Sequence, residues 1–355
     1  MLRIGYDAQA FLSPNGGMGK GLQLRNLLGS HIDTFIGFTS KSPNNTSRTF
    51  IQEGFSGHSA WQEFSLPRIL SRHKIDIFLS PENTAPFLLP SSVRLILVLH
   101  DMILFEGFRQ QKLKHRMKES FQRLQIPRSV ARAEVVLTVS DFSRNEILRA
   151  FPQANVRVIP CTIPEIWFQA VPAVARENFF LLVTSSAPHK NAAGAFEGYA
   201  QYVRAVERPV GLRVVGLSDR KKHFEEKLRV HGILDKVAFL PFLTDKELRE
   251  TYQKSQAVIV PSFSEGFGIP VLEAMATGTP VLCSNATSLP EVGGEAPVYF
   301  DPRDTNTIAS AIERTASDVG LREYIAQKGI ERAMIFHPTR VAEMVDAFWR
   351  EMRVE

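Results

Sequence analysis

Two glutamates, Glu265 and Glu273, flank a glycine-containing loop in the stretch PSFSEGFGIPVLEAMATGTPV. The apolar run before this loop predicts a strand. Pro270 predicts the start of a helix, because a proline in the first turn lacks only an N–H that has no partner there. Gly266 and Gly268 would leave backbone amides uncovered at that helix end, where anions bind. Carboxylates repel phosphate, so the glutamates would instead accept hydrogen bonds from neutral hydroxyls.

An anion-binding loop with a carboxylate at each end suits a nucleotide sugar, which carries hydroxyls at both ends and a diphosphate between them. A second interpretation stays open on the residues alone. In it, Glu265 and Glu273 are surface residues around a capped helix.

A second glycine-rich loop, SPNGGMGKGLQL at 13–24, lies between a predicted strand and a predicted helix over 20–28. It does not spell a Walker A loop, since Pro14 stands in place of the first glycine and Gly21 in place of Ser or Thr. It also lacks the third glycine of the dinucleotide-binding pattern, where Leu22 stands. Its glycines still favour close approach of the backbone to an anion.

His100 and Asp101 follow the apolar run LILVL, and Asp7 and Asn83 follow two other predicted strands. A lone histidine is more often a hydrogen-bonded core residue than a functional one. The carboxyl end of a parallel strand is, however, where α/β folds bind ligands. These four residues are therefore candidates for a binding cleft.

The composition is that of a globular enzyme, with 44% hydrophobic and 22% charged residues in a chain of 355. We find neither an apolar run long enough to span a membrane nor a secretory signal, so a cytoplasmic protein is expected. The two cysteines, Cys161 and Cys283, have no metal-binding spacing. No Asp-x-Asp motif occurs, and we expect no metal and no cofactor.

The net charge of +5 is concentrated between Arg109 and Arg132, where eight Lys or Arg stand against one acid, a local charge of +7. Leu113, Met117, Phe121 and Leu124 recur at helical spacing there, which predicts a basic amphipathic helix. One interpretation is the solvated face of a helix packed on the core. Another is attraction to anionic lipid or to an anionic acceptor, with peripheral binding at the inner membrane face. Nucleic acid is disfavoured, because stacking aromatics are not interleaved with the charges.

Short apolar runs alternate with helical patterns throughout, which predicts an α/β protein with two Rossmann-like, doubly wound domains facing a cleft. The predicted domains are residues 1–172, residues 173–337 and a C-terminal helix over 338–355. That helix has an apolar face of Val341, Met344, Val345 and Phe348. The predicted strands are 2–6, 34–39, 75–79, 95–99, 135–139, 156–159, 179–184, 210–215, 237–239, 257–260, 280–283 and 297–300.

The spacing of Glu265 and Glu273 matches the E-x7-E signature, and the sequence resembles the retaining glycosyltransferases of family 4. GGMGKGLQLRNLL, LHDM, VSDFSRNEI, APHKNAAGAFEGYA and SNATSLPEVGG extend the similarity over most of the chain. The resemblance implies the GT-B fold, in which the C-terminal helix crosses back to the first domain. Within this family, the sequence most resembles the bacterial mannosyl- and rhamnosyl-type transferases of O-antigen or polysaccharide synthesis.

The same resemblance implies roles for individual residues. Glu265 would bind sugar hydroxyls, Glu273 the ribose and Lys190 the diphosphate, while His100 would contact the transferred sugar. The further donor-binding residues are Gly17, Gly19, Ser185, Gly266, Phe267 and Gly268, and the acceptor or cleft residues are Asp7, Asn83 and Asp101. The sequence departs from the family at Ser185 and His189, since an arginine commonly stands at one of these places. Arg220 is a candidate to replace it.

The expected function is metal-independent, retaining transfer of a hexose from a nucleoside diphosphate sugar to a saccharide or lipid-linked acceptor in cell-surface polysaccharide or lipopolysaccharide synthesis. GDP-mannose is the leading donor. Two alternatives remain open: a transferase that uses a UDP-hexose, and a GT-B protein that binds nucleotide sugars without transferring them.

Overall fold

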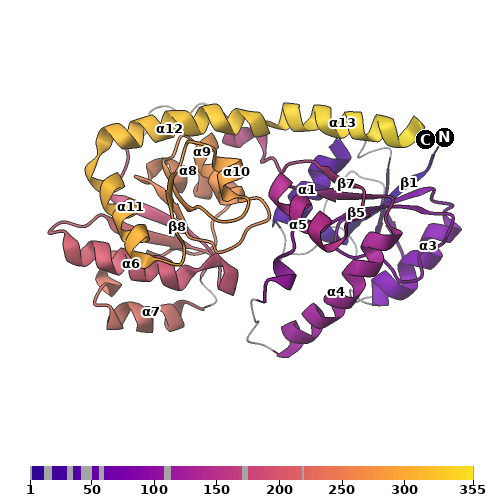
Figure 1. Ribbon diagram of the computed structural model, residues 1–355, viewed down its shortest axis with the longest axis horizontal. Coiled ribbons are helices and arrows are strands. Elements are labelled where there is room, and N and C mark those ends of the chain that lie inside the picture. Colours follow the sequence, from indigo (N-terminus) through magenta and orange to yellow (C-terminus); the bar gives the residue numbers. More distant parts are fainter. Residues whose placement is uncertain are drawn as a thin grey trace. The chain divides into compact units, whose positions relative to one another are not determined.

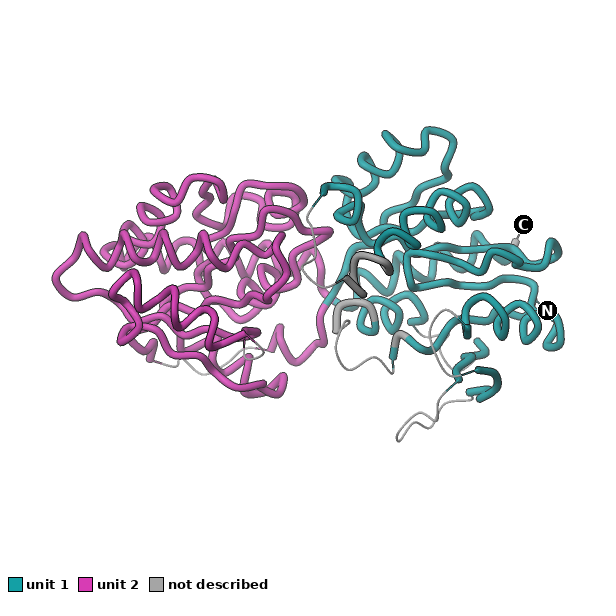
Figure 2. The backbone as a smooth tube through the Cα atoms, turned by 90° about the horizontal axis from the view of Figure 1, so that it is seen from below, with its two compact units in different colours: residues 1–107, 111–162, 338–355 teal, residues 108–110, 163–337 magenta. Residues whose placement is uncertain are grey.

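The computed structural model describes residues 2–11, 18–29, 35–40, 50–55, 60–107, 113–169, 175–217 and 220–354. The chain forms two compact units, coloured teal and magenta in Figure 2. Unit 1 contains residues 1–107, 111–162 and 338–355, and unit 2 contains residues 108–110 and 163–337. The sequence places the domain border at 172/173, which lies outside the described residues.

In its described residues, unit 1 is built on a seven-stranded parallel sheet with the order β3-β2-β1-β4-β5-β6-β7. The order reverses between β1 and β4, as in a doubly wound fold. Every described strand except β3 was predicted. The strands are β1 (Ile4–Asp7), β2 (Ile36–Thr39), β3 (Phe50–Gln52), β4 (Ile77–Ser80), β5 (Arg94–Val98), β6 (Val135–Thr138) and β7 (Val156–Val158).

Two apolar clusters cover the faces of this sheet because successive strand residues point to opposite sides. α1 (Met18–Leu28) and α13 (Pro338–Val354) pack on one face. α3 (Leu66–Arg72), α4 (Leu113–Arg132) and α5 (Asp141–Ala150) contribute side chains to the core on the other. Short turns complete the unit: η1 (Ala8–Phe11), the π-helical η3 (Trp61–Ser65) and η4 (Ile103–Phe105).

The C-terminal helix α13 is an integral part of unit 1 (Figure 1). The indole of Trp349 is fully buried, donates a 2.7 Å hydrogen bond to the Leu27 carbonyl of α1 and packs edge-on against Phe35. One predicted member of the apolar face is wrong, since Met344 is 44% exposed. The buried face continues instead through Trp349 and Met352, at the i+4 and i+7 spacing from Val345.

The basic segment forms the predicted helix, α4, but the two described residues of its stripe of large apolar residues do not face the core. Phe121 is 39% and Leu124 68% exposed. The side chains of Leu113 and Met117 lie outside the described part of the chain. The buried face is partly polar because it hydrogen-bonds the neighbouring elements: Gln125 donates to Glu63, and the Ser129 hydroxyl accepts from the Ala85 amide at 2.9 Å.

Unit 2 repeats the plan with six described parallel strands in the order β10-β9-β8-β11-β12-β13, which reverses between β8 and β11. The strands, all predicted, are β8 (Phe179–Val183), β9 (Gly211–Val215), β10 (Val237–Phe239), β11 (Val258–Val260), β12 (Val281–Ser284) and β13 (Val298–Phe300).

The helices of unit 2 are α6 (Ala192–Ala205), α7 (Lys221–Val230), α8 (Asp245–Lys254), α9 (Ile269–Ala276), α10 (Leu289–Gly293), α11 (Thr305–Ser317) and α12 (Val319–Ala333). Helices α6, α7 and α11 share a hydrophobic core with the sheet, and α9 packs on β11 and β12. The short turns are η5 (Glu165–Trp167), η6 (Pro188–Lys190), η8 (Leu234–Lys236) and η9 (Met334–Phe336). The two doubly wound parallel sheets confirm the predicted architecture. None of the described helices is long and apolar enough to cross a membrane.

Candidate donor and cleft residues

In each unit, some of the predicted site residues lie at the switch point of the sheet, where strand order reverses and the carboxyl ends of two neighbouring strands leave a crevice for a ligand. In unit 2 the switch lies between β8 and β11. The loop after β8 carries Lys190, and the loop after β11 carries Glu265. Neighbouring parallel strands thus bring together two residues that lie 75 positions apart.

Lys190 and Glu265 form a direct ion pair. The ammonium Nζ donates to both carboxylate oxygens of Glu265, at 2.7 and 2.8 Å, and the Ser262 hydroxyl donates to Oε1 at 2.7 Å. The Glu265 side chain is 9% exposed and that of Lys190 is 26% exposed. Charge-assisted hydrogen bonds of this length are strong. The site therefore holds a cation and a carboxylate whose charges compensate each other in a largely dehydrated place.

The loop between Glu265 and α9 is held by short polar side chains. The Glu265 amide donates to the Thr287 hydroxyl at 3.0 Å, and the Ser288 hydroxyl bonds the carbonyls of Glu265 and Phe267. Gly268 has φ +106°, and a Cβ there would meet Leu289 at 2.5 Å, so only glycine fits.

The three loop residues predicted to bind the donor, Gly266, Phe267 and Gly268, are all buried. The Phe267 ring packs edge-on against Phe336. What these residues can offer a ligand is consequently backbone. α9 starts at Ile269, one residue before the predicted start at Pro270.

Glu273 lies on the second turn of α9, and its carboxylate Oε2 accepts a 2.8 Å hydrogen bond from the Tyr252 hydroxyl of α8. Burial raises the pKa of Glu273 to about 7. The Tyr252 hydrogen bond lowers that pKa, and the nearby Asp245 carboxylate raises it. Glu273 thus titrates near neutral pH.

The turn after β8 positions the remaining predicted donor residues. The Ser185 hydroxyl accepts from the Ala187 amide at 3.3 Å. Asn191 has left-handed backbone angles and caps α6 by accepting from the Gly194 amide. Burial, and next the Lys190 ammonium, lower the pKa of His189, so this residue supplies no second cation at neutral pH. Arg220 precedes α7, beyond the end of β9, the strand next to β8.

In unit 1, Asp7 ends β1 at the switch point. Its carboxylate is 2% exposed and accepts hydrogen bonds from the Trp61 indole, 3.2 Å from each oxygen, and from the Gln9 amide at 3.0 Å. Burial, together with the Glu82 charge and against the two hydrogen bonds, raises the pKa of Asp7 to about 7. The indole fastens this side chain within unit 1.

Asn83 follows β4, the neighbour of β1, and His100 follows β5, the next strand in the sheet. The side-chain oxygen Oδ1 of Asn83 accepts from the His100 backbone amide at 3.1 Å. His100 Nε2 lies 3.2 Å from the Pro81 carbonyl, which can only accept, so Nε2 carries a proton. Asp101 accepts from the Ile103 amide at 3.1 Å and so orders the turn that follows.

Some predicted residues cannot be placed in the site, and others were missed. Gly17 lies outside the described residues, and Gly19 lies in the first turn of α1. Sequence reasoning did not identify Trp61, Ser262, Thr287, Ser288 or Tyr252. Ser262 had a usable signal, since it lies two residues after the strand that leads to Glu265. Tyr252 had none, because a buried aromatic four residues after Leu248 is typical of any helix core.

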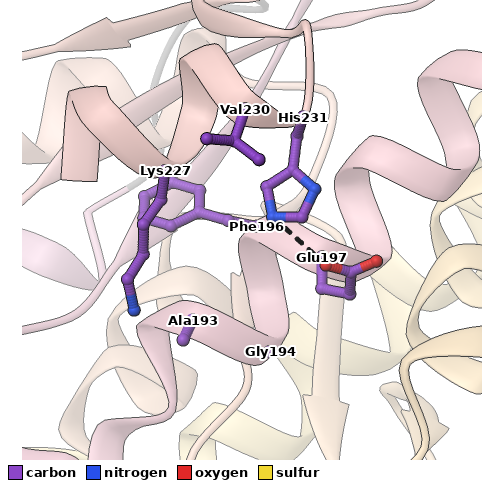
Figure 3. A pocket seen from close by; sticks show the side chains of 7 residues that line it. All are labelled: Ala193, Gly194, Phe196, Glu197, Lys227, Val230 and His231. Atoms are coloured by element: carbon purple, nitrogen blue, oxygen red, sulfur yellow. Dashed lines mark ion pairs between the residues drawn. The ribbon is translucent and has the colours of Figure 1, made fainter.

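A separate hollow of about 460 Å³ lies between α6 and α7 (Figure 3). His231 Nε2 lies 3.2 Å from Glu197 in its wall, and Phe196, Lys227 and Val230 line it as well. None of the predicted site residues lines this hollow. The predicted donor residues therefore lie at the switch point of the sheet and not at this cavity.

Comparison with known proteins agrees with this layout. Residues 164–332 match the family model of group 1 glycosyl transferases, and residues 39–165 match that of Glycosyltransferase Family 4. O-antigen chain mannosyltransferase B of Escherichia coli is 30% identical over 267 residues, which are 70% of this chain and 68% of that protein. The O-antigen chain mannosyltransferase RfbU of Salmonella typhimurium is 30% identical over 200 residues, and this alignment spans 56% of this chain and about half (55%) of RfbU.

Solved glycosyltransferase structures share the fold along nearly the whole chain. Sucrose-phosphate synthase from Thermosynechococcus elongatus superposes with a TM-score of 0.77 at 18% identity and covers 100% of both chains. WaaG, a glycosyltransferase involved in lipopolysaccharide biosynthesis, superposes with a TM-score of 0.72 at 16% identity over 97% of this chain and 99% of its own. The fold and the switch-point layout define a GT-B glycosyltransferase. The chain belongs to glycosyltransferase family 4.

Proposed function

We propose that this enzyme is a retaining hexosyltransferase that moves mannose from GDP-mannose to a saccharide or lipid-linked acceptor in the synthesis of a cell-surface polysaccharide. The observation that carries the proposal is the pairing of Lys190 with Glu265 at the unit 2 switch point. That pair offers an ammonium for a diphosphate and a carboxylate for sugar hydroxyls side by side. The choice of mannose is supported by the mannosyltransferases among the relatives.

In this proposal Lys190 leaves the Glu265 carboxylate for the diphosphate when the donor binds. Glu265 then accepts hydrogen bonds from the hexose, Glu273 binds the ribose, and His100 contacts the transferred sugar. Negative charge develops on the leaving β-phosphate oxygen, and Lys190 with the loop amides stabilises it. The leaving phosphate accepts the proton of the acceptor hydroxyl at the face from which it departs. No separate general base is assigned.

A panel of nucleotide sugars tests the donor. We expect GDP-mannose to raise the melting temperature more than UDP-glucose, UDP-galactose or UDP-N-acetylglucosamine does, since a ligand at 100 times its Kd stabilises by about 2.7 kcal/mol. Radiolabelled donor is then incubated with saccharide acceptors. Binding without transfer or hydrolysis would favour a protein that only binds nucleotide sugars, and a larger shift with a UDP-hexose would replace the proposed donor.

We expect transfer to survive EDTA with no more than about a twofold loss of rate. Lys190 and the loop amides would stabilise the leaving group, and the sequence contains no Asp-x-Asp motif. Initial rates are measured with EDTA and with added Mg²⁺ or Mn²⁺, and a denatured and refolded sample guards against retained metal. A strict requirement for Mn²⁺ would refute metal independence.

We also propose that unit 1 binds the anionic inner face of the membrane, where a lipid-linked acceptor would reside. Exposed apolar side chains of α4 and of the loop before β5 lie together: the rings of Phe87 and Phe121 are 6.1 Å apart, and the Arg128 guanidinium lies 4.7 Å from the Phe87 ring. Apolar groups flanked by cations suit an anionic lipid interface. We call this the α4 surface; it comprises Phe87, Leu88, Phe121, Arg123, Leu124 and Arg128.

Leu88→Ser with Leu124→Ser should lower binding to phosphatidylglycerol-containing vesicles about tenfold, because these side chains are 77% and 68% exposed and would lose their burial in lipid. Wild-type binding should also fall as salt rises. Co-sedimentation measures both. Val230→Ser is the matched control, since Val230 is 86% exposed on unit 2. No binding at low salt, or equal losses in both variants, would rule out the α4 surface.

A further inference from the structure

Tyr252 is a buried residue of α8 that the motif does not include. Its side chain is 0% exposed, and Trp167 packs edge-on against its ring with 5.7 Å between centroids. The Thr279 hydroxyl donates to its backbone carbonyl at 3.0 Å. The ring is therefore held on one side by η5, and its backbone is tied to the segment that leads into β12.

The Tyr252 hydroxyl bridges α8 to α9 by donating to Glu273 Oε2 at 2.8 Å. Burial raises the pKa of Tyr252 well above its usual value, so the phenol stays protonated and donates at any physiological pH. Within the described ranges this is the one hydrogen bond to the Glu273 carboxyl group. A carboxylate has about four acceptor sites on two oxygens, so the rest of its acceptor capacity is available to a ligand.

The two glutamates of the motif are supported by different chemistry. Glu265 has the Lys190 ammonium and the Ser262 hydroxyl as partners. In the part of the chain that the structure describes, no cation pairs with Glu273: the groups that act on its charge are Tyr252 and Asp245, both of α8. Helices α10 and α12 also pack on α9. The Arg332 side chain of α12 donates to the backbone carbonyls of Glu291 and Val292 in α10, and not to Glu273.

We propose that Tyr252 is a positioning residue of the donor site, whose hydroxyl holds the Glu273 carboxylate ionised and oriented to accept hydrogen bonds from the ribose hydroxyls of the donor. The inference rests on the proposed donor site. It adds Tyr252, a neutral residue outside the E-x7-E motif, as the group that keeps the ribose-binding Glu273 ionised. An ionised carboxylate forms stronger hydrogen bonds with hydroxyl donors than a neutral carboxyl group does.

The proposal predicts a specific dependence on pH. The pKa of Glu273 is about 7, raised mainly by burial, and the hydrogen bond from Tyr252 lowers it. The affinity for a nucleotide that carries ribose, relative to the same nucleotide without the ribose hydroxyls, should therefore increase as pH rises through 7. Removing the Tyr252 hydroxyl removes a contribution that favours the ionised form, so the midpoint of that increase should move upward, by about one pH unit for one charge-assisted hydrogen bond.

The test compares the affinity of the intact protein for GDP and for 2′,3′-dideoxy-GDP by calorimetry between pH 5.5 and 8.5, with the UDP pair used if UDP binds more tightly. Tyr252→Phe should lower the preference for the ribose form about tenfold at pH 7 and regain part of it at higher pH. Tyr199→Phe is the matched control. It removes another buried phenol of unit 2, whose hydroxyl donates to the Val210 carbonyl at 2.8 Å, and should change neither preference nor midpoint.

A second variant covers the case in which Tyr252→Phe does not fold. 3-Fluorotyrosine at position 252 keeps the ring and makes the hydroxyl a stronger donor, so the midpoint should move to lower pH. An unchanged midpoint and preference in both variants would overturn the role of Tyr252. Equal affinity of the wild-type protein for the ribose and dideoxy forms would instead remove Glu273 from the ribose site. Binding of neither GDP nor UDP would end the proposed donor site and this inference together.

Discussion

Glu265→Gln is expected to lower the rate of glycosyl transfer by about 10²–10³-fold, while GDP binds as tightly as before or more tightly. Glutamine keeps the size of the side chain but lacks the negative charge of the carboxylate, which accepts hydrogen bonds from Lys190 and Ser262. The hexose then loses an acceptor whose bonds strengthen in the transition state. The Lys190 ammonium, no longer paired with a carboxylate, is free to bind a diphosphate.

Initial rates with labelled GDP-mannose and titration with GDP measure the two effects separately. Glu323→Gln on α12 is a suitable control, because it removes an acid of unit 2 that lies outside the site. Unchanged turnover in Glu265→Gln would contradict the sugar-binding role. Much weaker GDP binding would show that Glu265 does not compete with the diphosphate for Lys190.

Lys190→Ala is expected to weaken binding of both GDP and GDP-mannose by about a hundredfold. It removes the cation proposed to bind the diphosphate, and a charge-assisted hydrogen bond to a desolvated group is worth about 1.5–3 kcal/mol. It also leaves the Glu265 carboxylate uncompensated at a position 8% exposed, where it would repel the diphosphate.

The repulsion between the uncompensated Glu265 carboxylate and the diphosphate can be measured separately. Lys190→Ala should reduce GDP affinity by a smaller factor when Glu265 is already replaced by glutamine. Calorimetry on the wild type, both single variants and the double variant closes the cycle. Lys254→Ala serves as the control, since it removes a cation of α8 that pairs with Glu177 rather than with the site. Equal GDP affinity in wild type and Lys190→Ala would reject the diphosphate role.

The strands of both units were predictable because parallel strands buried on two faces read as short apolar runs. β3 was missed because its three residues, Phe50–Gln52, end in a glutamine and lie at the sheet edge, where burial is incomplete. The predicted apolar face of α13 is buried at Val341, Val345 and Phe348 but not at Met344, and the buried Trp349 and Met352 were missed. Helical spacing alone could not show that Trp349 is buried, because its burial depends on contact with the end of α1.

The positions of site residues were predictable where those residues follow the ends of strands. Lys190 and Glu265 follow neighbouring strands, so their approach follows from the strand order. Their direct pairing did not follow, because the sequence does not specify which partner a charged side chain selects. Tyr252 could not be found at all, since its hydroxyl meets Glu273 only through the packing of α8 on α9.

The last helix has a consequence for how the chain folds during synthesis. Because α13 supplies Trp349, Val345 and Val341 to the core of unit 1, that core lacks one layer until α13 itself has left the ribosome. Unit 2, whose residues all precede α13, can close its own core earlier. The half of the protein that is made first is thus completed last, and a fragment ending at 162 would expose the apolar groove that this helix fills.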